Sequence, residues 1–390
     1  MSQQLSSDQI SSLYERSSRL LAEMKADMPD DIASKELGLR FNVKLAAAMV
    51  GRSDATIRRA EESGELPPPK KRQTGKRFGY TLEDVNHMRD VFGTRPWRSD
   101  TDDPIVLGVQ NFKGGVGKST LAVHAAQYFA LQGYRVLVID ADPQASSTAM
   151  FGVHPERDID TEDTMLPFLA GEEPNLIHAV KPTYWDGLDI IPSCLGLYDA
   201  EYFIAGSSVD PENRFEKIRR GLVDIAPAYD IVVIDPPPAL GMISINVLRA
   251  TNALLIPTPP SSIDYSSTVS FLSMLTAVLR QVEGRGLNND FKFVHLVATK
   301  VDENKSAHIG MRDAMKTVFG GDILSTALLD SAEFDNANVE MRTVYEYAGP
   351  MNSTYKRCRS NLDLVMGDLE LAIRNSWPSH RRDLRMKGVA

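Results

Sequence analysis

The chain has 390 residues, 43% of them hydrophobic, so it is long enough for two or three domains and can bury a core. This composition excludes a fully disordered chain and a collagen-like fibre. The net charge of -9 argues against a nucleic-acid-binding protein, but the charge is unevenly distributed. Residues 40–98 contain 13 Lys or Arg and 7 Asp or Glu, a net of +6, which leaves -15 for the remainder. We therefore expect one basic segment suited to a polyanion.

The two cysteines, Cys194 and Cys358, are too few for a disulfide framework or a cysteine metal cluster. They are expected to be buried thiols in a reducing cytoplasm. No apolar run approaches the roughly 18 residues that a membrane span needs, and residues 1–18 lack the apolar core of a signal peptide. The expected location is the cytoplasm.

Residues 7–28 carry apolar side chains at nearly helical spacing, which predicts one amphipathic helix within an N-terminal segment 1–39. The apolar set is Ile10, Leu13, Tyr14, Leu20, Leu21 and Met24. An apolar stripe of this kind requires a partner, which is either the helix's own domain or a second copy of the chain. A polar stretch, residues 27–35, follows it.

Residues 40–98 are expected to form a DNA-binding domain. The pattern predicts a helix over 43–49, a turn at Gly51, a second helix over 54–62 and a basic strand–turn–strand over 70–77. This order resembles a winged helix-turn-helix of the MerR-like kind, in which the second helix enters the major groove and the wing lies along phosphates. The predicted DNA contacts are Ser53, Thr56, Arg58, Arg59, Lys70, Lys71, Arg72, Lys76 and Arg77. The alternative is a solvated basic surface.

Residues 94–104 are rich in Pro, Ser and Asp and are typical of a linker. From residue 105 onward, short apolar runs alternate with longer helical patterns, which predicts an α/β domain over 99–390 with a mainly parallel sheet buried on both faces. The predicted strands are 105–110, 136–139, 188–191, 231–234, 253–256 and 294–298.

A phosphate-binding loop follows the first predicted strand, with the sequence Lys113-Gly114-Gly115-Val116-Gly117-Lys118-Ser119-Thr120. Glycines allow backbone N–H groups to wrap a phosphate, and the helix that follows adds the positive end of its dipole. Lys118 is expected to reach the β- and γ-phosphates and Ser119 to bind Mg²⁺. The loop departs from the standard pattern because Phe112 occupies the position of its first glycine, and Lys113 comes next.

Aspartates close two of the predicted strands, where ligands bind in open α/β sheets. Asp140 and Asp142 follow 136–139, and Asp235 follows 231–234. A carboxylate at the end of a buried strand is costly unless something binds it, and Mg²⁺ held by a phosphate chain is the natural partner. Each aspartate taken alone could instead be a helix N-cap.

The loop 113–120, together with 140–144 (DADPQ), resembles the deviant Walker A ATPases of the ParA/MinD family. Stretches 79–81, 86–94, 187–194 and 341–344 extend the resemblance over nearly the whole chain, to the large plasmid-partition members with an N-terminal DNA-binding domain. It implies a P-loop NTPase fold that follows the N-terminal helix and the winged domain. It also implies slow, Mg²⁺-dependent hydrolysis of ATP, stimulated by a ParB-type partner and DNA.

The resemblance also implies roles for single residues. Lys113 matches the signature lysine that reaches the nucleotide of the second subunit in an ATP-sandwich homodimer. Asp142 matches the aspartate that positions the attacking water, and Asp140 and Asp235 match acidic residues near Mg²⁺. The segment Pro257-Thr258-Pro259 matches one near the adenine. The implied function is DNA partition on the nucleoid, with binding of nonspecific DNA as an ATP dimer and repression of the protein's own operon through operator DNA.

Several alternatives remain open at this stage. Thr299-Lys300-Val301-Asp302 resembles the guanine-reading motif of GTPases, although the family resemblance favours ATP. A transcriptional repressor switched by nucleotide would need the same two domains. A MinD-like membrane-positioning ATPase would place basic residues on an apolar C-terminal helix. We instead expect Trp377-Pro378 to end that helix before the basic cluster Arg381, Arg382, Arg385 and Lys387, and its apolar stripe to be core. The cluster, with Arg342, Lys356, Arg357 and Arg359, is a further candidate for nonspecific DNA contact. An iron–sulfur reductase of the same superfamily is disfavoured, because two distant cysteines do not resemble its cluster motif.

Overall fold

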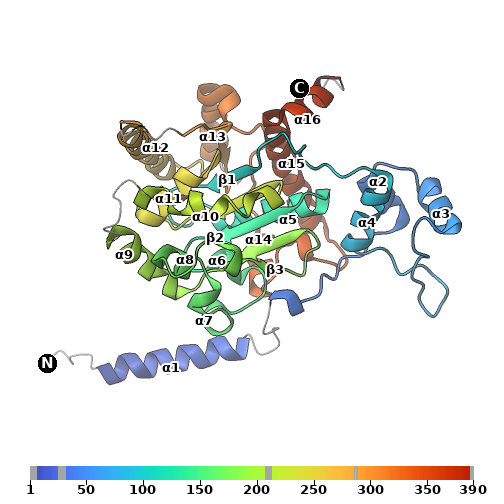
Figure 1. Ribbon diagram of the computed structural model, residues 1–390, viewed down its shortest axis with the longest axis horizontal. Helices are drawn as coiled ribbons and strands as arrows, with labels where there is room; N and C mark the ends of the chain where they lie inside the picture. The colour runs from blue at the N-terminus through green and yellow to red at the C-terminus, as the bar shows by residue number, and fades with distance from the viewer. Residues whose placement is uncertain (1–6, 25–31, 207–212, 285, 287–288, 387–390) are drawn as a thin grey trace.

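The structure, a computed structural model, describes residues 7–24, 32–206, 213–284, 286 and 289–386 (Figure 1). Its centre is a seven-stranded sheet in the order β3-β4-β2-β5-β1-β6-β7, in which every neighbouring pair is parallel except β3 with β4. The strands are β1 (Ile105–Val109), β2 (Val136–Asp140), β3 (Lys181–Pro182), β4 (Leu188–Ile191), β5 (Ile231–Asp235), β6 (Ala253–Thr258) and β7 (Phe293–Ala298).

Both faces of the sheet are buried because successive side chains along each strand point to opposite sides. In β1, Ile105, Leu107 and Val109 pack with α5 (Lys118–Gln132) and α15 (Ser353–Ser376), whereas Val106 packs with the helices of the opposite face. Helices α8 (Leu166–Ala170), α9 (Asp199–Gly206), α10 (Lys217–Leu222) and α11 (Met242–Ala250) cover that opposite face. Helices α12 (Ser262–Glu283) and α13 (Ser306–Phe319) pack on β6 and β7. The remaining helices of this part are α6 (Ser146–Ala149), α7 (Pro155–Asp158), α14 (Ala332–Val339) and α16 (Pro378–Met386).

The six strands predicted from sequence are all present, and the α/β P-loop architecture with a mainly parallel sheet is confirmed. Strand β3, which has two residues and pairs antiparallel at the edge, was not predicted from the sequence. The C-terminal apolar stripe is core, as predicted, with Leu362, Val365, Leu369 and Ile373 buried in α15. This helix ends at Ser376, as predicted, and Arg381, Arg382 and Arg385 of the basic cluster lie in a further helix, α16, while Lys387 falls outside the described residues. Cys194 and Cys358 are buried and free.

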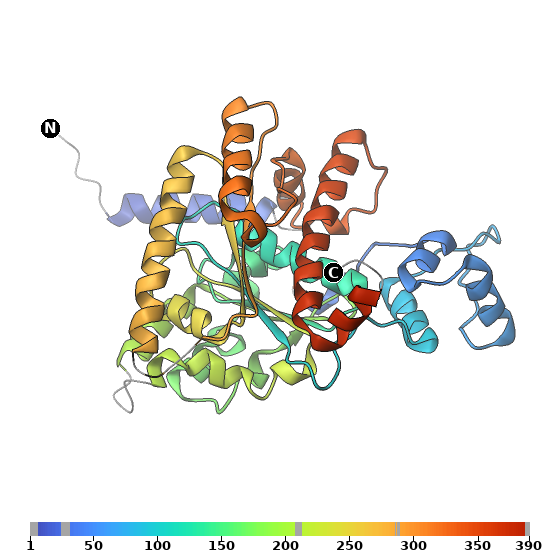
Figure 2. The ribbon, with the colours of Figure 1, turned by 90° about the horizontal axis from the view of Figure 1, so that it is seen from above.

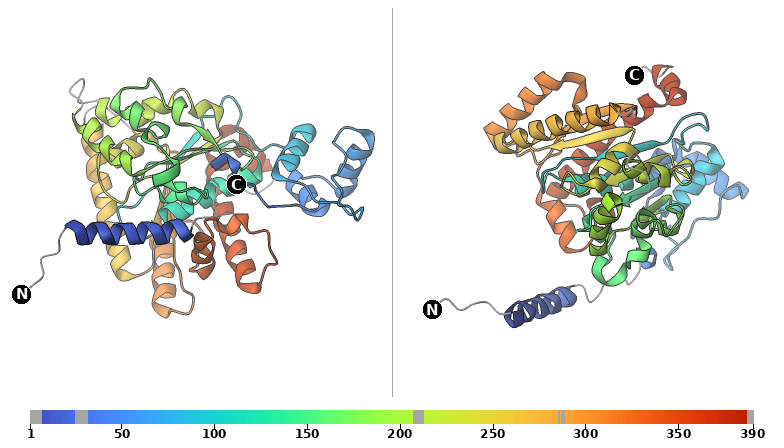
Figure 3. Two further views of the ribbon diagram at one scale, coloured as in Figure 1. Left: turned by 90° about the horizontal axis from the view of Figure 1, so that it is seen from below. Right: turned by 60° about the vertical axis from the view of Figure 1, so that its left-hand side comes forward.

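Helix α1 (Ser7–Met24) lies apart from the sheet and its helices in Figure 1 and in the right-hand view of Figure 3. The predicted continuation to residue 28 falls outside the described residues. Four apolar side chains of α1 are not packed on the rest of the chain, since Ile10, Leu13, Tyr14 and Leu20 are 53–70% exposed. The structure therefore does not bury these four side chains against the chain's own domain, which was one of the two expectations for this helix.

Three short helices and a hairpin form a separate unit at one end of the molecule (Figure 2). The helices are α2 (Val43–Val50), α3 (Asp54–Ser63) and α4 (Leu82–Phe92), and the hairpin spans 70–78. We call residues 41–93 the basic module. Its small core comprises Ala46, Ala47, Val50, Ile57, Ala60, Leu66, Leu82, Val85 and Met88.

Residues 32–40, which precede the basic module, contact the sheet domain. Lys35 forms an ion pair with Glu346 at 2.7 Å and donates hydrogen bonds to the hydroxyl of Tyr184 and the carbonyl of Met341. Among the described residues, no helix is both long enough and apolar enough to cross a membrane.

Candidate nucleotide site and basic module

The phosphate loop lies between the end of β1 and the start of α5, as its order in the sequence predicts. Gly115 and Gly117 have φ angles of 73° and 98°, a left-handed conformation that glycine adopts without strain. A Cβ on Gly114, Gly115 or Gly117 would meet no atom within 4 Å, so the loop borders open space. That space is a cavity of about 660 Å³ lined by the whole segment from Gly114 to Thr120. The shape fits a loop that wraps a phosphate chain.

Lys118 begins α5 and is buried at 7% exposure. Its Nζ donates to the carbonyl oxygen of Lys113 at 3.1 Å, which curls the side chain back over the loop. Burial lowers the pKa of Lys118, while the carboxylates of Asp235 and Asp142 oppose that shift. An ammonium held in this way is placed to meet phosphate oxygens in the cavity.

Three aspartates gather at the carboxyl ends of two adjacent strands. Asp140 and Asp235 are register partners in β2 and β5, and both are fully buried. Burial raises the pKa of Asp140 well above its usual range, and the charge of Asp235 adds to the effect. Burial also raises the pKa of Asp235 to about 6. Thr148 donates to Asp140 and Ser147 donates to Asp235, so each carboxylate is held by a hydroxyl.

The aspartate cluster fits a divalent cation. The Oδ1 atom of Asp235 is buried and has no hydrogen-bond partner among the described residues. Two buried carboxylates side by side repel each other, and a hard cation with oxygen ligands removes that cost. Asp142 lines the cavity beside Lys118 and is 8% exposed. Burial raises its pKa, against the backbone N–H of Gln144 and the charge of Lys118.

Lys113 does not point into the cavity. Its ammonium forms an ion pair with Asp264, near the start of α12, and Asp264 also accepts a hydrogen bond from Ser261. Lys113 is not among the residues that line the cavity. Within one chain, therefore, the predicted signature lysine is held by a carboxylate away from the phosphate loop.

The far wall of the cavity is formed by residues that carried no motif in the sequence. Leu328, Leu329, Asp330, Ser331 and, from α14, Phe334, Asp335 and Asn338 line it together with Thr299 and Lys300. The segment Pro257-Thr258-Pro259 does not line it: Pro257 and Thr258 end β6, are buried, and contact Asn111 and Thr299. The adenine contact expected for 257–259 stays a prediction, while the loop 328–331 and α14 border the cavity.

Only part of the guanine-like motif 299–302 borders the cavity. Thr299 and Lys300 line the cavity, and the Thr299 hydroxyl donates to the carbonyl of Val116 at 3.0 Å. Asp302, the residue that would read a guanine, instead accepts the backbone N–H of Asn304 and pairs with Lys305 at 3.3 Å. This geometry does not favour GTP.

The basic module places most of its predicted DNA contacts on its surface. Gly51 ends α2 with a φ of 68°, and the Ser53 hydroxyl caps α3 by accepting the N–H of Thr56 at 3.1 Å. The hairpin is held by backbone hydrogen bonds from Arg72 to Lys76 and from Phe78 to Lys70, both 2.8 Å. Six basic side chains are exposed on α3 and the hairpin, namely Arg58, Arg59, Lys70, Lys71, Arg72 and Lys76.

Arg77 is the exception among the predicted basic contacts. Its guanidinium pairs with Glu61 of α3 at 2.7 Å and donates to the hydroxyl of Tyr80, which in turn donates to Glu61. The hydrogen bond to Glu61 raises the pKa of Arg77. Arg77 therefore fastens the hairpin to α3 and orients the exposed residues around it.

Comparison with known proteins identifies relatives of this chain and of its fold. A family model described as an AAA domain matches residues 105–293. The protein SopA of Escherichia coli (strain K12) is 37% identical over 352 residues, which cover 88% of this chain and 89% of SopA. The solved structure of a partition protein superposes with a TM-score of 0.64 at 23% identity, covering 93% of this chain and 98% of that one. Cobyrinic acid a,c-diamide synthase from Mycobacterium smegmatis, solved with an ATP analogue and magnesium, has a TM-score of 0.51 at 24% identity, covering 61% and 95%. The two structures share the fold of this chain.

Proposed function

The chain belongs to the ParA family of partition ATPases, and on this premise we propose that it hydrolyses ATP to ADP and phosphate to drive the segregation of a DNA replicon. The observation that carries the proposal is the cavity lined by the glycine loop, Lys118 and Asp142, together with the buried aspartate pair Asp140 and Asp235 at the ends of β2 and β5 next to it. Phosphoryl transfer needs little covalent chemistry from the protein and depends on placing charge around the γ-phosphoryl group.

Each residue has a distinct part in this reaction. The N–H groups of 114–119 and the ammonium of Lys118 hold the phosphate chain. Ser119, Asp140 and Asp235 hold Mg²⁺, directly or through water, and the ion offsets the charge of the phosphates. Asp142 orients the attacking water and accepts its proton. The elevated pKa of Asp142 brings it closer to neutral pH, which suits a proton acceptor.

Lys113 acts across a dimer. Its side chain leaves Asp264 and reaches the nucleotide of the second subunit when two ATP-bound chains face each other. Hydrolysis is slow as long as this arrangement is incomplete, and a ParB-type centromere-binding protein together with DNA completes it. The exposed stripe of α1 forms a second, nucleotide-independent contact between the same two chains.

The basic module forms a winged helix-turn-helix that binds operator DNA. Arg58 and Arg59 of α3 lie at the major groove, Ser53 and Thr56 at its edge, and the hairpin along the phosphates. The ATP dimer binds nonspecific DNA on the nucleoid, and the ADP or nucleotide-free form favours the operator and represses the protein's own operon. The protein thus works in the cytoplasm, bound to DNA and not to membrane.

The test is phosphate release by the full chain with Mg²⁺-ATP, with and without DNA and a ParB-type protein. We expect slow turnover that both additions stimulate, and a loss of at least about 10²-fold in Lys118→Ala. Normal turnover by Lys118→Ala would contradict the proposal.

A nucleotide-switched transcriptional repressor is the second candidate, favoured by the direct junction of the basic module with the phosphate-loop helix. Operator binding that responds to nucleotide, without any stimulation of turnover by DNA and partner, would establish it. Binding to anionic vesicles with ATP would instead favour a membrane-positioning ATPase; the burial of the α15 stripe argues against that function.

A further inference from the structure

The basic module is joined to the phosphate-loop helix at the end opposite the phosphates. Arg89 of α4 donates from Nη2 to the carbonyl oxygen of Leu131 at 2.7 Å, in the last turn of α5. The same guanidinium donates to Asn86 at 2.6 Å and to the carbonyl of Met49, in α2, at 3.3 Å. Arg89 is 1% exposed, so this is a buried connection between α2, α4 and α5.

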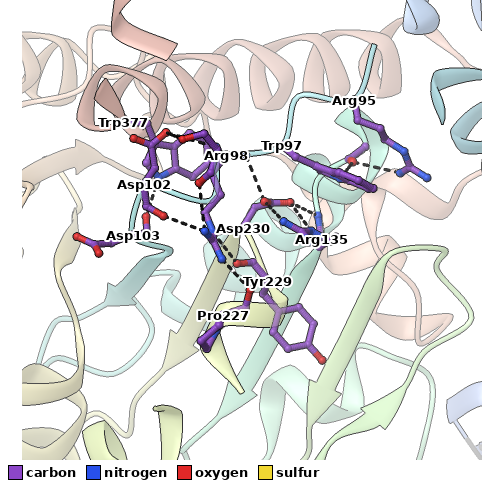
Figure 4. A network of polar contacts seen from close by, with 12 residues as sticks. Arg95, Trp97, Arg98, Asp102, Asp103, Arg135, Pro227, Tyr229, Asp230 and Trp377 are labelled. Atoms are coloured by element: carbon purple, nitrogen blue, oxygen red, sulfur yellow. Dashed lines mark hydrogen bonds and ion pairs between the residues drawn. The ribbon is translucent and has the colours of Figure 1, made fainter. Parts of the chain in front are cut away.

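The linker adds two more donors at the same end of α5. Arg95 donates from Nη1 to the carbonyl of Gly133 at 3.2 Å, and the indole N–H of Trp97 donates to that carbonyl at 3.1 Å (Figure 4). Carbonyl groups at a helix C-terminus lack partners within the helix, and the negative end of its dipole favours cations there. Arg89, Arg95 and Trp97 therefore cap α5 from outside its domain.

The fit at this junction is close. Gly133 has a φ of 101°, and a Cβ at this position would lie 2.8 Å from the guanidinium of Arg89. The linker itself is fixed: Arg98 donates to the carbonyls of Pro227, Tyr229 and Asp102, and Trp377 donates to that of Asp103 (Figure 4). A segment with the composition of a flexible linker is in fact tied along the sheet domain.

A 15-residue helix is a rigid rod of about 22 Å. The N-terminal end of α5 carries the groups that face the phosphates, and its C-terminal end carries the carbonyls that the module grips. A small rotation or shift of α5 on phosphate binding would move the carbonyl of Leu131 and, with it, Arg89, because no loop separates them. The hydrogen bond from Arg89 to the carbonyl of Met49 would transmit this movement to α2, which is followed directly by α3 and its exposed arginines.

We propose that Arg89 is the positioning residue that couples the nucleotide site to the DNA-binding surface, through the C-terminal end of α5. The inference rests on the proposed function, since it specifies how nucleotide controls the basic module. By reciprocity, DNA on the module changes the affinity for nucleotide by the same factor as nucleotide changes the affinity for DNA.

The first test is hydrogen–deuterium exchange on the full chain, with and without ADP and Mg²⁺. We expect exchange to slow at residues 113–132 and also, by about fivefold or more, at 43–50 and 82–92. In Arg89→Met the change at 113–132 should remain and the change in the module should disappear. Arg98→Met is the matched control, because it removes another arginine tie between linker and sheet domain that does not touch α5, and it should keep both changes.

A change confined to residues 113–132 in the wild type, or an undiminished module response in Arg89→Met, would overturn the coupling and leave the ATPase proposal intact. No change even at 113–120 would mean that the chain does not bind the nucleotide, and the proposed function itself would fail. If Arg89→Met does not fold, Arg89→Lys replaces it, because lysine keeps the charge but cannot reach all three acceptors. The wild-type measurement does not depend on either variant.

The second test measures the affinity for a labelled duplex of the DNA immediately upstream of the chain's own coding sequence, with and without ADP and Mg²⁺. The ratio of the two affinities should differ from one by about fivefold or more in wild type and Arg98→Met, and should fall to one in Arg89→Met. A role of Arg89 in stability alone would weaken both affinities and leave their ratio unchanged, which would overturn the proposal.

Discussion

Asp140 and Asp235 stand opposite each other in adjacent parallel strands, and both are fully buried. Two like charges in this position destabilise the protein when no cation is bound, because burial already disfavours the charged form of each. The two carboxylates are therefore suited to a state with a bound cation, and folding alone does not require them.

The Asp235→Asn variant separates these two effects. Without Mg²⁺ it should unfold at a temperature no lower than that of the wild type, because one buried charge is removed. Saturating ADP and Mg²⁺, which at 100 times Kd stabilise a protein by about 2.7 kcal/mol, should no longer raise its unfolding temperature. Differential scanning calorimetry measures both quantities. Asp189→Asn, in β4 and outside the cavity, is the control and should respond to nucleotide like the wild type.

Asp264 should restrain the formation of the ATP dimer. The Lys113–Asp264 pair is partly exposed, 32% and 25%, so breaking it costs at most about 1 kcal/mol. Because both copies of Lys113 must leave Asp264 in a symmetric dimer, at up to about 1 kcal/mol each, Asp264→Asn should tighten ATP-dependent dimerisation by up to about 30-fold in sedimentation velocity. Adding Lys113→Ala should abolish the gain. A gain that persists in the double variant would show that Asp264 acts independently of Lys113.

His124 should make the stability of the protein depend on pH. Its ring is buried between the carbonyl of Thr120 and the N–H of Val344, and burial lowers its pKa to about 4 from the usual 6.5. Between these values the unfolded chain binds more protons at this residue, so the stability that His124 contributes falls as the pH falls from 6.5 towards 4, whereas the raised pKa values of Asp140 and Asp235 act in the opposite direction. The full difference is about 3 kcal/mol. Urea unfolding of His124→Gln should show a shallower loss over this range, and an unchanged pH slope would contradict the assignment.

The parts of the molecule that the sequence predicts correctly are those governed by local order. The strand, glycine loop and helix of 105–132 follow from spacing alone, and the aspartates at 140 and 235 meet because parallel strands end at one edge of the sheet. The second wall of the cavity was not predictable in this way. Leu328, Ser331 and Asn338 carry no motif and reach the loop only through the packing of α14.

Contacts between residues far apart in the sequence also determine two features that the local composition did not predict. Arg77 appeared in a basic run, but its partner Glu61 is sixteen positions away, on another element. Residues 94–104 have the Pro and Asp content of a flexible linker, yet Arg98 finds its acceptors about 130 positions further along the chain. No pattern within the segment signals such contacts, because the acceptors are backbone carbonyls that every residue carries.

Helix α1 should contribute to dimerisation without nucleotide. Ile10 and Leu13 belong to its exposed apolar stripe, and covering such side chains is worth roughly 1.5–3 kcal/mol each. Replacing both by Lys should shift the nucleotide-free protein towards the monomer in analytical ultracentrifugation. Lys at Ser11 and Ser12 adds the same charge outside the stripe and should leave the association unchanged. Equal dissociation in both variants would mean that charge, and not the stripe, controls assembly.

The hairpin of the basic module should determine the salt dependence of DNA binding. Lys71 and Arg72 are exposed on it, and each phosphate contact contributes about 0.9 to the slope of log K against log salt concentration. Lys71→Ala with Arg72→Ala should weaken operator binding and reduce that slope by up to about 1.8, as measured by fluorescence anisotropy from low to physiological salt. Lys305→Ala with Lys316→Ala, exposed on and just before α13, removes the same charge elsewhere and should leave the slope unchanged. An unchanged slope in the hairpin variant would place the DNA on another surface, because a lost phosphate contact always releases fewer counterions.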